Sequence, residues 1–286
     1  MLSKTKPTTC TLGELMIYQI SKTIEDGILA FHGFGSPLVQ LALHLAKNNH
    51  APNLILVAGA TYGINPKPPF LTPTSNDLAM GWGAECSIEI DELFDVAASG
   101  RMGRMFLSGL QIDKWGNMNV TRLGDDKKLN MKLPGGGGGC NLSCDVENIT
   151  IWTAAHRALP NAKGRRRYRL TESCDYITNV GHLTSDNTPR KQMSYLGKGP
   201  DNIVTDLALF DFDDDGHARL INLYPDTSIA DVKESTGFKF PIDENLSVCE
   251  LPDAAMIEFI RKLDPMKIHE RELSNNDRNR NFALKG

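Results

Sequence analysis

The residues best placed for chemistry follow a short apolar run at positions 54–57. A continuous apolar run is typical of a strand buried on both faces, as in a parallel sheet. Open α/β sheets bind their ligands just beyond the carboxyl ends of such strands. Here that position holds small residues and Tyr62, and no carboxylate that could act as a nucleophile. Tyr62 can donate a hydrogen bond to a substrate carboxylate or carbonyl, or pack against a subunit interface, and the sequence favours neither.

A second candidate is the turn His32-Gly33-Phe34-Gly35-Ser36-Pro37, between an expected strand and an expected helix. It carries two glycines of a G-x-G-x-x-G dinucleotide fingerprint, but Leu38 replaces the third, which argues against a nicotinamide site. The glycines would still let a ligand approach the backbone, and the helix start would offer free N–H groups to an anion or a carbonyl oxygen. A turn with no ligand, and a purely structural histidine, also fit the motif. The predicted substrate-binding residues here are His32, Gly33, Phe34 and Gly35.

Five consecutive glycines form a third candidate. Such a run costs conformational entropy on folding, so it indicates that a ligand passes close to the backbone or that a loop becomes ordered around one. A plain flexible linker is the alternative. The residues concerned are Gly135, Gly136, Gly137, Gly138 and Gly139.

Three amide side chains complete the polar candidates. Asn65 follows the apolar run, while Gln111 and Asn119 flank a turn at 113–117. We predict that they contact substrate, although amides at a turn can equally well only hold the loop together.

Two motifs resemble metal sites but are incomplete. Cys140 and Cys144 have no second pair or nearby histidine to complete a zinc site. Residues 211–217 imitate the start of a calcium loop, but its twelfth position would be Asn222 rather than a bidentate glutamate, so a hairpin turn is the better interpretation. We therefore expect no metal.

Composition excludes several function classes. The net charge of −4 gives no electrostatic case for binding nucleic acid or an anionic membrane. No apolar run approaches the roughly 20 residues of a membrane helix. The polar N-terminus lacks the apolar core of a signal peptide, and six scattered cysteines are typical of reduced thiols. We expect a cytoplasmic protein.

The surrounding elements predict an α/β fold with an open, mostly parallel sheet flanked by helices. A strand at 28–31, a helix at 38–48 and the strand at 54–57 form a βαβ unit, whose two strands should be parallel. Thr11 and Glu14 should cap an earlier helix. Ser36 should cap the helix that follows the glycine turn, with Pro37 at its first position. No linker or repeat divides the chain, so we expect one domain at 1–266 and a polar, fraying tail at 267–286. Further helices are expected at 88–99, 229–236 and 253–263, and further strands at 105–107, 148–155, 168–171, 176–180, 203–212 and 218–224.

Taken together, these features resemble the β subunit of family I CoA-transferases, especially glutaconate CoA-transferase. The resemblance covers about residues 11–265 and depends on the order and spacing of motifs that are weak singly. The motifs are His32–Pro37, the segment 108–119 (Ser-Gly-Leu-Gln-Ile-Asp-Lys-Trp-Gly-Asn-Met-Asn), the glycine run after Leu133-Pro134, residues 205–210, Tyr224-Pro225, Thr236-Gly237-Phe238 and Leu263-Asp264-Pro265.

The resemblance implies a CoA-transferase family I fold and an obligate α subunit, in an α2β2 or larger assembly. It also implies an acyl-CoA site near the subunit interface, with coenzyme A as part of the substrate and no bound cofactor. In working transferases of this family, a glutamate just after the second strand attacks the thioester and becomes a glutamyl-CoA thioester. Its place falls on Ala58 here, beside Gly59, and shifting the register finds no carboxylate. An alanine methyl cannot form the covalent intermediate.

Some transferase-like heteromers lack this glutamate, and decarboxylate 3-methylglutaconyl-CoA or hydrolytically open a ring of a steroid-derived acyl-CoA. Residues 65–73 and 203–265 look nearest to the decarboxylase, whose β subunit has a cysteine in the glutamate's place. We therefore expect a decarboxylase or C–C hydrolase subunit acting on a carboxylated or β-oxo acyl-CoA, with a catalytic region at Ala58, Gly59 and Tyr62. The alternatives are a true CoA-transferase that uses another carboxylate, and a non-catalytic structural subunit.

Overall fold

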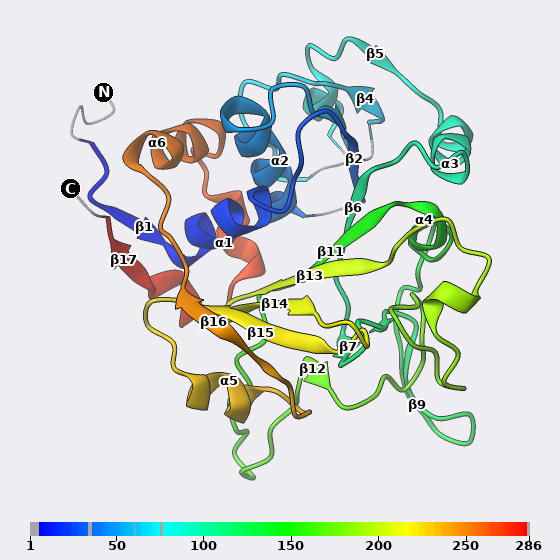
Figure 1. Cartoon of the computed structure of the whole chain (residues 1–286). Helices are drawn as coiled ribbons and strands as arrows, with labels where there is room; N and C mark the ends of the chain where they lie inside the picture. The colour runs from blue at the N-terminus through cyan, green and yellow to red at the C-terminus, as the bar shows by residue number, and fades with distance from the viewer. Residues whose placement is uncertain (1–5, 34–35, 60, 75–76, 285–286) are drawn as a thin grey trace. The chain divides into compact units, whose positions relative to one another are not determined.

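The computed structural model describes residues 6–33, 36–59, 61–74 and 77–284. Phe34 and Gly35, two of the predicted substrate-binding residues, lie outside the described residues. The chain forms two compact units (Figure 1). Unit 1 comprises Met1–Leu93 and Glu250–Gly286, and unit 2 comprises Phe94–Cys249. Helix α3 (Ile90–Ala98), predicted at 88–99, begins in unit 1 and ends in unit 2.

Unit 1 contains the predicted βαβ unit. Strands β2 (Leu29–His32) and β3 (Ile55–Val57) are parallel neighbours, and α2 (Pro37–Asn49) connects them. The short strands β4 (Gly63–Ile64) and β5 (Cys86–Ser87) extend this sheet in antiparallel fashion beyond β3. The sheet therefore presents the carboxyl ends of β2 and β3 at the same edge. Unit 1 also contains the helices α1 (Leu12–Ser21), η1 (Leu78–Gly81) and α6 (Ala254–Leu263).

The starts of the first two helices follow from capping residues. Thr11 Oγ1 accepts from the Glu14 N–H at 3.2 Å, and the Glu14 carboxylate accepts from the Thr11 N–H at 2.7 Å, so α1 has the predicted capping box. Ser36 caps α2, and Pro37 occupies its first position, as predicted. These caps fix where the chain leaves β1 (Thr9–Thr11) and β2.

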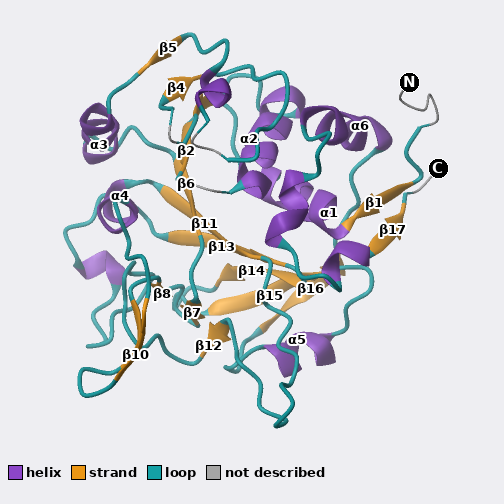
Figure 2. Ribbon diagram, turned by 180° about the vertical axis from the view of Figure 1, so that it is seen from behind, coloured by secondary structure: helices purple, strands orange, loops and turns teal. Residues whose placement is uncertain are grey.

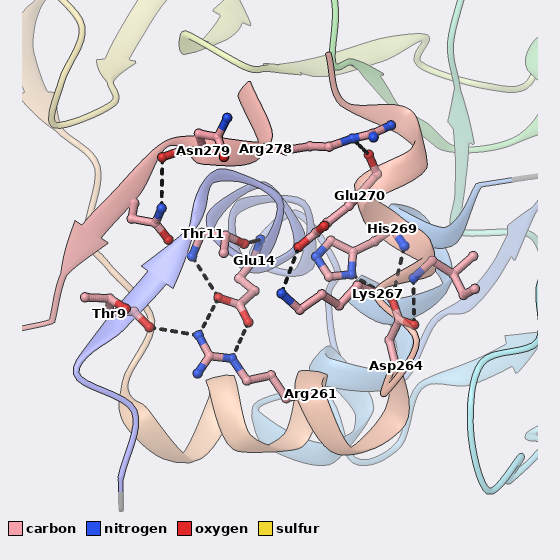
Figure 3. Close-up of polar contacts among 12 residues, drawn as sticks. Thr9, Thr11, Glu14, Arg261, Asp264, Lys267, His269, Glu270, Arg278 and Asn279 are labelled. Carbon is pink, nitrogen blue, oxygen red and sulfur yellow. Dashed lines mark hydrogen bonds and ion pairs between the residues drawn. The ribbon is translucent and has the colours of Figure 1, made fainter. Parts of the chain in front are cut away.

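The C-terminal segment is ordered, contrary to the predicted fraying. Strand β17 (Asn281–Ala283) pairs with β1, and the turns η3 (Ile268–Glu272) and η4 (Asp277–Asn279) precede it. The buried Asp264 carboxylate accepts from the N–H groups of Ile268 and His269 and from the His269 ring (Figure 3). Arg261 on α6 forms an ion pair with the buried Glu14 on α1 at 2.6 Å. The fraying prediction was wrong because charge and asparagine content alone do not reveal such pairings.

Unit 2 contains a six-stranded sheet in the order β16-β15-β14-β13-β11-β6. Three of its five pairings are parallel, so the predicted α/β class with an open, mostly parallel sheet is confirmed. The six strands are β6 (Arg104–Leu107), β11 (Asn148–Thr153), β13 (Pro200–Thr205), β14 (Ala208–Phe212), β15 (Ala218–Leu223) and β16 (Ile242–Val248).

Smaller elements surround this sheet (Figure 2). Strands β7, β8 and β12 form a three-stranded sheet, and β9 and β10 form a hairpin. The hairpin between β14 and β15 confirms the interpretation of residues 211–217 as a turn. The bounds are β7 (Gln111–Asp113), β8 (Met118–Asn119), β9 (Arg122–Gly124), β10 (Leu129–Lys132), β12 (Leu170–Thr171), α4 (Gly139–Asp145), η2 (Arg190–Gln192) and α5 (Ile229–Ser235).

Two strand predictions in unit 2 differ from the structure, and the edge strand β16 was missed. The single strand predicted at 203–212 is a hairpin, because Thr205 Oγ1 accepts from the N–H groups of Leu207 and Ala208 and turns the chain. The strand predicted at 176–180 is only an isolated bridge between Asn179 and Met118. Strand β16 was not predicted because its residues are mostly polar and exposed, as at the edge of a sheet.

Candidate functional site

The carboxyl end of β3 delivers Ala58 and Gly59 to a tight turn. Ala58 is 3% exposed, its N–H donates to Gly63 O, and its carbonyl accepts from the Tyr62 N–H, both at 2.9 Å. Tyr62 adopts a left-handed backbone with φ of 51°, which is uncommon for a residue with a bulky side chain. Strained backbone of this kind is often found at functional sites, which supports a functional role for this turn.

His32, at the end of β2, supports this turn from the neighbouring strand. The Gly59 N–H donates to His32 Nε2 at 3.3 Å, so Nδ1 carries the proton and donates to Gly33 O at 2.9 Å. Burial lowers the pKa of His32 to about 4, which keeps the ring neutral at pH 7. A Cβ on Gly59 would lie 3.0 Å from the His32 ring and 3.1 Å from Gly33 O. Both ring nitrogens of His32 are therefore engaged within the protein, and Gly59 is required for the close approach of the two strand ends.

Gly33 and the start of α2 flank the predicted glycine turn. A Cβ on Gly33 would meet no atom of the described residues within 4 Å, which leaves space beside its backbone. The first N–H groups of α2, however, already have acceptors: Leu38 donates to Glu272 Oε2, Val39 to Ser36 Oγ, and Gln40 to Ser36 O. The prediction that this helix start offers free N–H groups to an anion is therefore wrong.

Glu272 is a carboxyl group at the start of α2 that the sequence did not reveal. It lies in η3 and accepts from the Leu38 N–H at 3.1 Å. Burial raises the pKa of Glu272 to about 8, against the weaker opposing effect of the Leu38 hydrogen bond. The side chain is therefore mostly protonated at neutral pH, and a protonated carboxyl group is a poor nucleophile.

Asn65 holds β3 in place. Its Oδ1 accepts from the Leu56 N–H at 3.0 Å, its own N–H donates to Leu56 O at 2.8 Å, and its Nδ2 donates to Glu85 at 3.1 Å. Asn65 is 8% exposed and has φ of 48°. Its amide is thus committed to the backbone of β3, which is the holding role that we considered for the predicted amides.

Two hydroxyl groups in the same turn have no such commitment. Thr61 Oγ1 is buried and has no hydrogen-bond partner among the described residues. In the same part of the chain, the half-buried Tyr62 hydroxyl makes no hydrogen bond either. Free hydroxyls just beyond the end of β3 are suited to donate hydrogen bonds to a carbonyl oxygen. Thr61 was not among the predicted residues, because a threonine in a turn carries no distinguishing signal.

The predicted amides of unit 2 are bonded to each other. Asn119 is fully buried, and its Nδ2 donates to Gln111 Oε1 at 2.7 Å. The same Gln111 oxygen accepts from the Asp175 N–H at 2.9 Å. Asn119 Oδ1 accepts from the N–H groups of Thr121 and Arg122. Within unit 2, therefore, both side chains hold the loops around β7 and β8.

The glycine run in unit 2 contains two kinds of position. Gly135 and Gly137 have φ of 94° and 51°, and a Cβ on either would meet nothing within 4 Å. Gly136 and Gly138 are packed, with a Cβ falling 2.7 Å from Thr178 and 2.6 Å from Phe94, respectively. Gly139 begins α4. The open, left-handed pair leaves room for a ligand beside the backbone, whereas the packed pair fixes the path of the loop.

The sequence and fold of this chain are similar to those of CoA-transferase subunits. The chain is 27% identical to the B subunit of 3-oxoadipate CoA-transferase of Pseudomonas knackmussii over 254 residues, which cover 88% of this chain and 92% of the relative. It is 28% identical to the B subunit of glutaconate CoA-transferase of Acidaminococcus fermentans over 272 residues, covering 90% and 94%. It is 21% identical to the IpdB subunit of the cholesterol ring-cleaving hydrolase of Mycobacterium tuberculosis over 245 residues, covering 83% and 90%. No family model matches the chain.

Solved structures agree with these relatives. The decarboxylase AibA/AibB superimposes with a TM-score of 0.77 at 28% identity, over 92% of this chain and 98% of that chain. Glutaconate coenzyme A-transferase from Acidaminococcus fermentans gives a TM-score of 0.77 at 25% identity, over 93% and 98%. The chain is therefore a homologue of the B subunits of CoA-transferases and of the transferase-like decarboxylase and hydrolase heteromers, and the predicted family is confirmed.

None of the described helices is both long enough and apolar enough to cross a membrane.

Proposed function

We propose that this chain is the β subunit of a CoA-transferase-like heteromer that acts on a carboxylated or β-oxo acyl-CoA without a glutamyl-CoA intermediate. The reaction is decarboxylation or hydrolysis of a carbon–carbon bond. The observation that carries this proposal is Ala58, which occupies the position expected for the family's nucleophilic glutamate at the end of β3. An alanine methyl cannot form an anhydride or a thioester.

The proposed chemistry needs an electron sink rather than a nucleophile. When a β-carboxylate leaves as CO₂, its bonding electron pair passes to the thioester carbonyl as an enolate, and a proton then completes the product. A hydrogen-bond donor beside the carbonyl oxygen stabilises this enolate. We assign that role to the Tyr62 hydroxyl, supported by its freedom from other partners in the described part of the chain. Thr61 is the second candidate donor.

The names of the relatives support both versions of the reaction, since they include a decarboxylase and a ring-cleaving hydrolase. They also support a partner subunit of the same family, because these relatives are named as a B subunit or as a complex of two subunits. We propose that the two subunits assemble as α2β2 or larger. The remaining predicted binding residues, Gly33, Gly135 and Gly137 in particular, have open space where a substrate backbone contact would fall.

A true CoA-transferase is the second candidate, and Glu272 is the observation that favours it. Glu272 follows α6 in sequence and contacts the first turn of α2, so unit 1 does hold a carboxyl group beside the glycine turn. Its raised pKa of about 8 opposes a nucleophilic role at neutral pH. The lyase or hydrolase is therefore the better-supported function.

The two candidates are separated by assaying the heteromer, co-expressed with its α subunit, on carboxylated acyl-CoAs with and without acetate. We expect turnover without acetate, accompanied by release of CO₂ or of a carboxylic acid. Tyr62→Phe should reduce kcat about tenfold to a hundredfold, the usual effect of losing one oxyanion donor or slightly less. Acetate-dependent CoA exchange that is abolished by Glu272→Gln would instead establish the transferase.

A further inference from the structure

Unit 1 contains a cavity away from the carboxyl end of β3. It has a volume of about 410 Å³ and opens between α2, α6 and the segment that follows β4. The two helices lie side by side (Figures 1 and 2). Cavities of this size are typical of small-molecule sites. Leu54, which contacts the cavity residue Lys47, precedes β3, whereas Ala58 follows it, so the cavity belongs to the opposite end of that strand.

The charged residues that line this cavity are all lysines, and Asn48 and Asn65 line it as uncharged polar residues. Lys47 comes from α2, Lys67 from the segment after β4, and Lys262 from α6, and no described lining residue is acidic. Lys67 and Lys262 make no ion pair or hydrogen bond through their ammonium groups within the described part of the chain. Lys47 donates to the carbonyl oxygens of Leu54 and Pro52, which do not neutralise its charge. Three unneutralised cations around one cavity, in a chain with a net charge of −4, require an explanation.

His44 adds an uncharged donor to the same cavity. It lies one turn before Lys47 on α2, is half-buried, and has no hydrogen-bond partner among the residues that the structure describes. Burial lowers the pKa of His44 to about 4, with smaller contributions from His32 and Lys47. At pH 7 the ring is neutral and offers one N–H group and one acceptor nitrogen.

The segments that supply two of the lysines also supply apolar lining residues. Phe259 and Leu263 on α6 line the cavity together with Pro66 and Pro68. The proline-rich segment is held in place because the Lys67 N–H donates to Trp82 O at 2.7 Å. Prolines restrict the backbone before any ligand arrives, so little ordering entropy is lost on binding.

We propose that this cavity binds a phosphorylated small molecule with a flat apolar body, that is, a nucleotide. A phosphate monoester carries about two negative charges at neutral pH, and lysine ammonium groups bind phosphate as point charges. The phosphates lie among Lys47, Lys67 and Lys262, and the base lies against Phe259. The source is either a free nucleotide or the adenosine phosphate end of coenzyme A, since both present the same chemistry.

Isothermal titration calorimetry of the purified full-length chain with ADP, inorganic phosphate and adenosine tests the proposal. We expect ADP to bind at least about tenfold more tightly than adenosine, with an affinity that falls as salt is added. Lys67→Glu and Lys262→Glu should each weaken ADP binding about tenfold or more. The matched control is Lys128→Glu, a charge reversal at an exposed lysine of unit 2, which should stay within about twofold.

Phe259→Ala separates the proposed contact with the base from the proposed contacts with phosphate. It should weaken ADP binding but leave binding of inorganic phosphate within about twofold, because only the base contacts the ring. Competition with coenzyme A then identifies the source of the ligand. If coenzyme A displaces ADP and binds more weakly to Lys262→Glu, the cavity binds the adenosine phosphate end of coenzyme A. If coenzyme A does not compete with ADP, the ligand is a free nucleotide. ADP binding that is undetectable, or unchanged in both lysine variants, would overturn the proposal. Neither result depends on the acyl-CoA reaction proposed above.

Discussion

The two ends of β3 differ in how their polar groups are used. Beyond its carboxyl end, the Gly59 N–H donates to His32, and the Ala58 backbone bonds to Tyr62 and Gly63. The hydroxyls of Thr61 and Tyr62 have no partner in the described structure. At its other end, the lysines around the cavity are not neutralised by the protein. The hydrogen bonds at the carboxyl end fix the backbone geometry, whereas the lysines at the other end favour binding of an anion. Substitutions should therefore affect stability at one end and binding at the other.

The largest effect is expected from the double variant Lys67→Glu/Lys262→Glu. It replaces two attractive charges by two repulsive ones, so ADP affinity should fall about a hundredfold or more, equivalent to roughly 2.7 kcal/mol. Both side chains are exposed, so the free energy of unfolding should change by less than about 0.5 kcal/mol. Calorimetry and urea unfolding measure the two quantities. A variant that loses stability and binding together would remove the distinction between the two ends.

Asn65→Ala should lower the free energy of unfolding, because Asn65 lines the cavity and also bonds to the backbone of β3. It leaves the buried Leu56 N–H without its side-chain acceptor, and removes the contact with Glu85, so we expect a loss of about 2 kcal/mol in unfolding free energy. Asn48→Ala, at an exposed position near the end of α2, is the control and should change stability by under about 0.5 kcal/mol. Equal effects of the two substitutions would mean that Asn65 does not hold β3.

Gly59→Ala tests the close approach of the two strand ends. The added Cβ would lie 3.0 Å from the His32 ring, so the ring or the turn must shift, at a cost of about 1–2 kcal/mol. Gly33→Ala is the matched control, because its Cβ would meet no atom within 4 Å. Thermal unfolding of both variants should show a clear loss only for Gly59→Ala. The reverse order would contradict the described packing.

Glu272→Gln should have the smallest effect, visible only as a function of pH. Because the folded-state pKa of Glu272 is about 8, above its usual value, the folded chain keeps this proton while the unfolded chain loses it. Stability from this group is complete at acidic pH, falls as the pH rises toward 8, and then levels off. The glutamine variant should lack that decline and be about 1 kcal/mol more stable than the wild type near pH 9, because the partly exposed side chain keeps some contact with water. Identical pH profiles of urea unfolding would exclude a buried, protonated Glu272.

The sequence predicted the local parts of this structure well. The capping box of α1, the Ser36-Pro37 start of α2 and the parallel pair β2 and β3 all depend on residues close together in the chain. The ordering of the C-terminal segment was missed because β17 pairs with β1, from the other end of the chain. The spacing of residues in the sequence does not predict a pairing between strands so far apart in the chain.

The same limit applies to the candidate site. Ala58 and Tyr62 could be placed because they follow a recognisable strand, and the glycines because their spacing is distinctive. Glu272 reaches the start of α2 from a distant segment, and the three lysines of the cavity come from three separate elements. Their proximity results from the fold, so no local sequence pattern predicts it. Conversely, Asn65 and His32 have the residue types of a binding site but are engaged in holding the strands.

Ala58 follows β3 directly, where we expect a transferase to carry its nucleophile. The most direct measurement is to incubate the heteromer with its acyl-CoA substrate, trap with borohydride or hydroxylamine, and map the peptides of this chain by mass spectrometry. The account predicts turnover with no modified carboxylate on any peptide, including those that contain Glu272 and Glu85. A glutamate of this chain recovered as its alcohol or hydroxamate, formed at the rate of turnover, would contradict it.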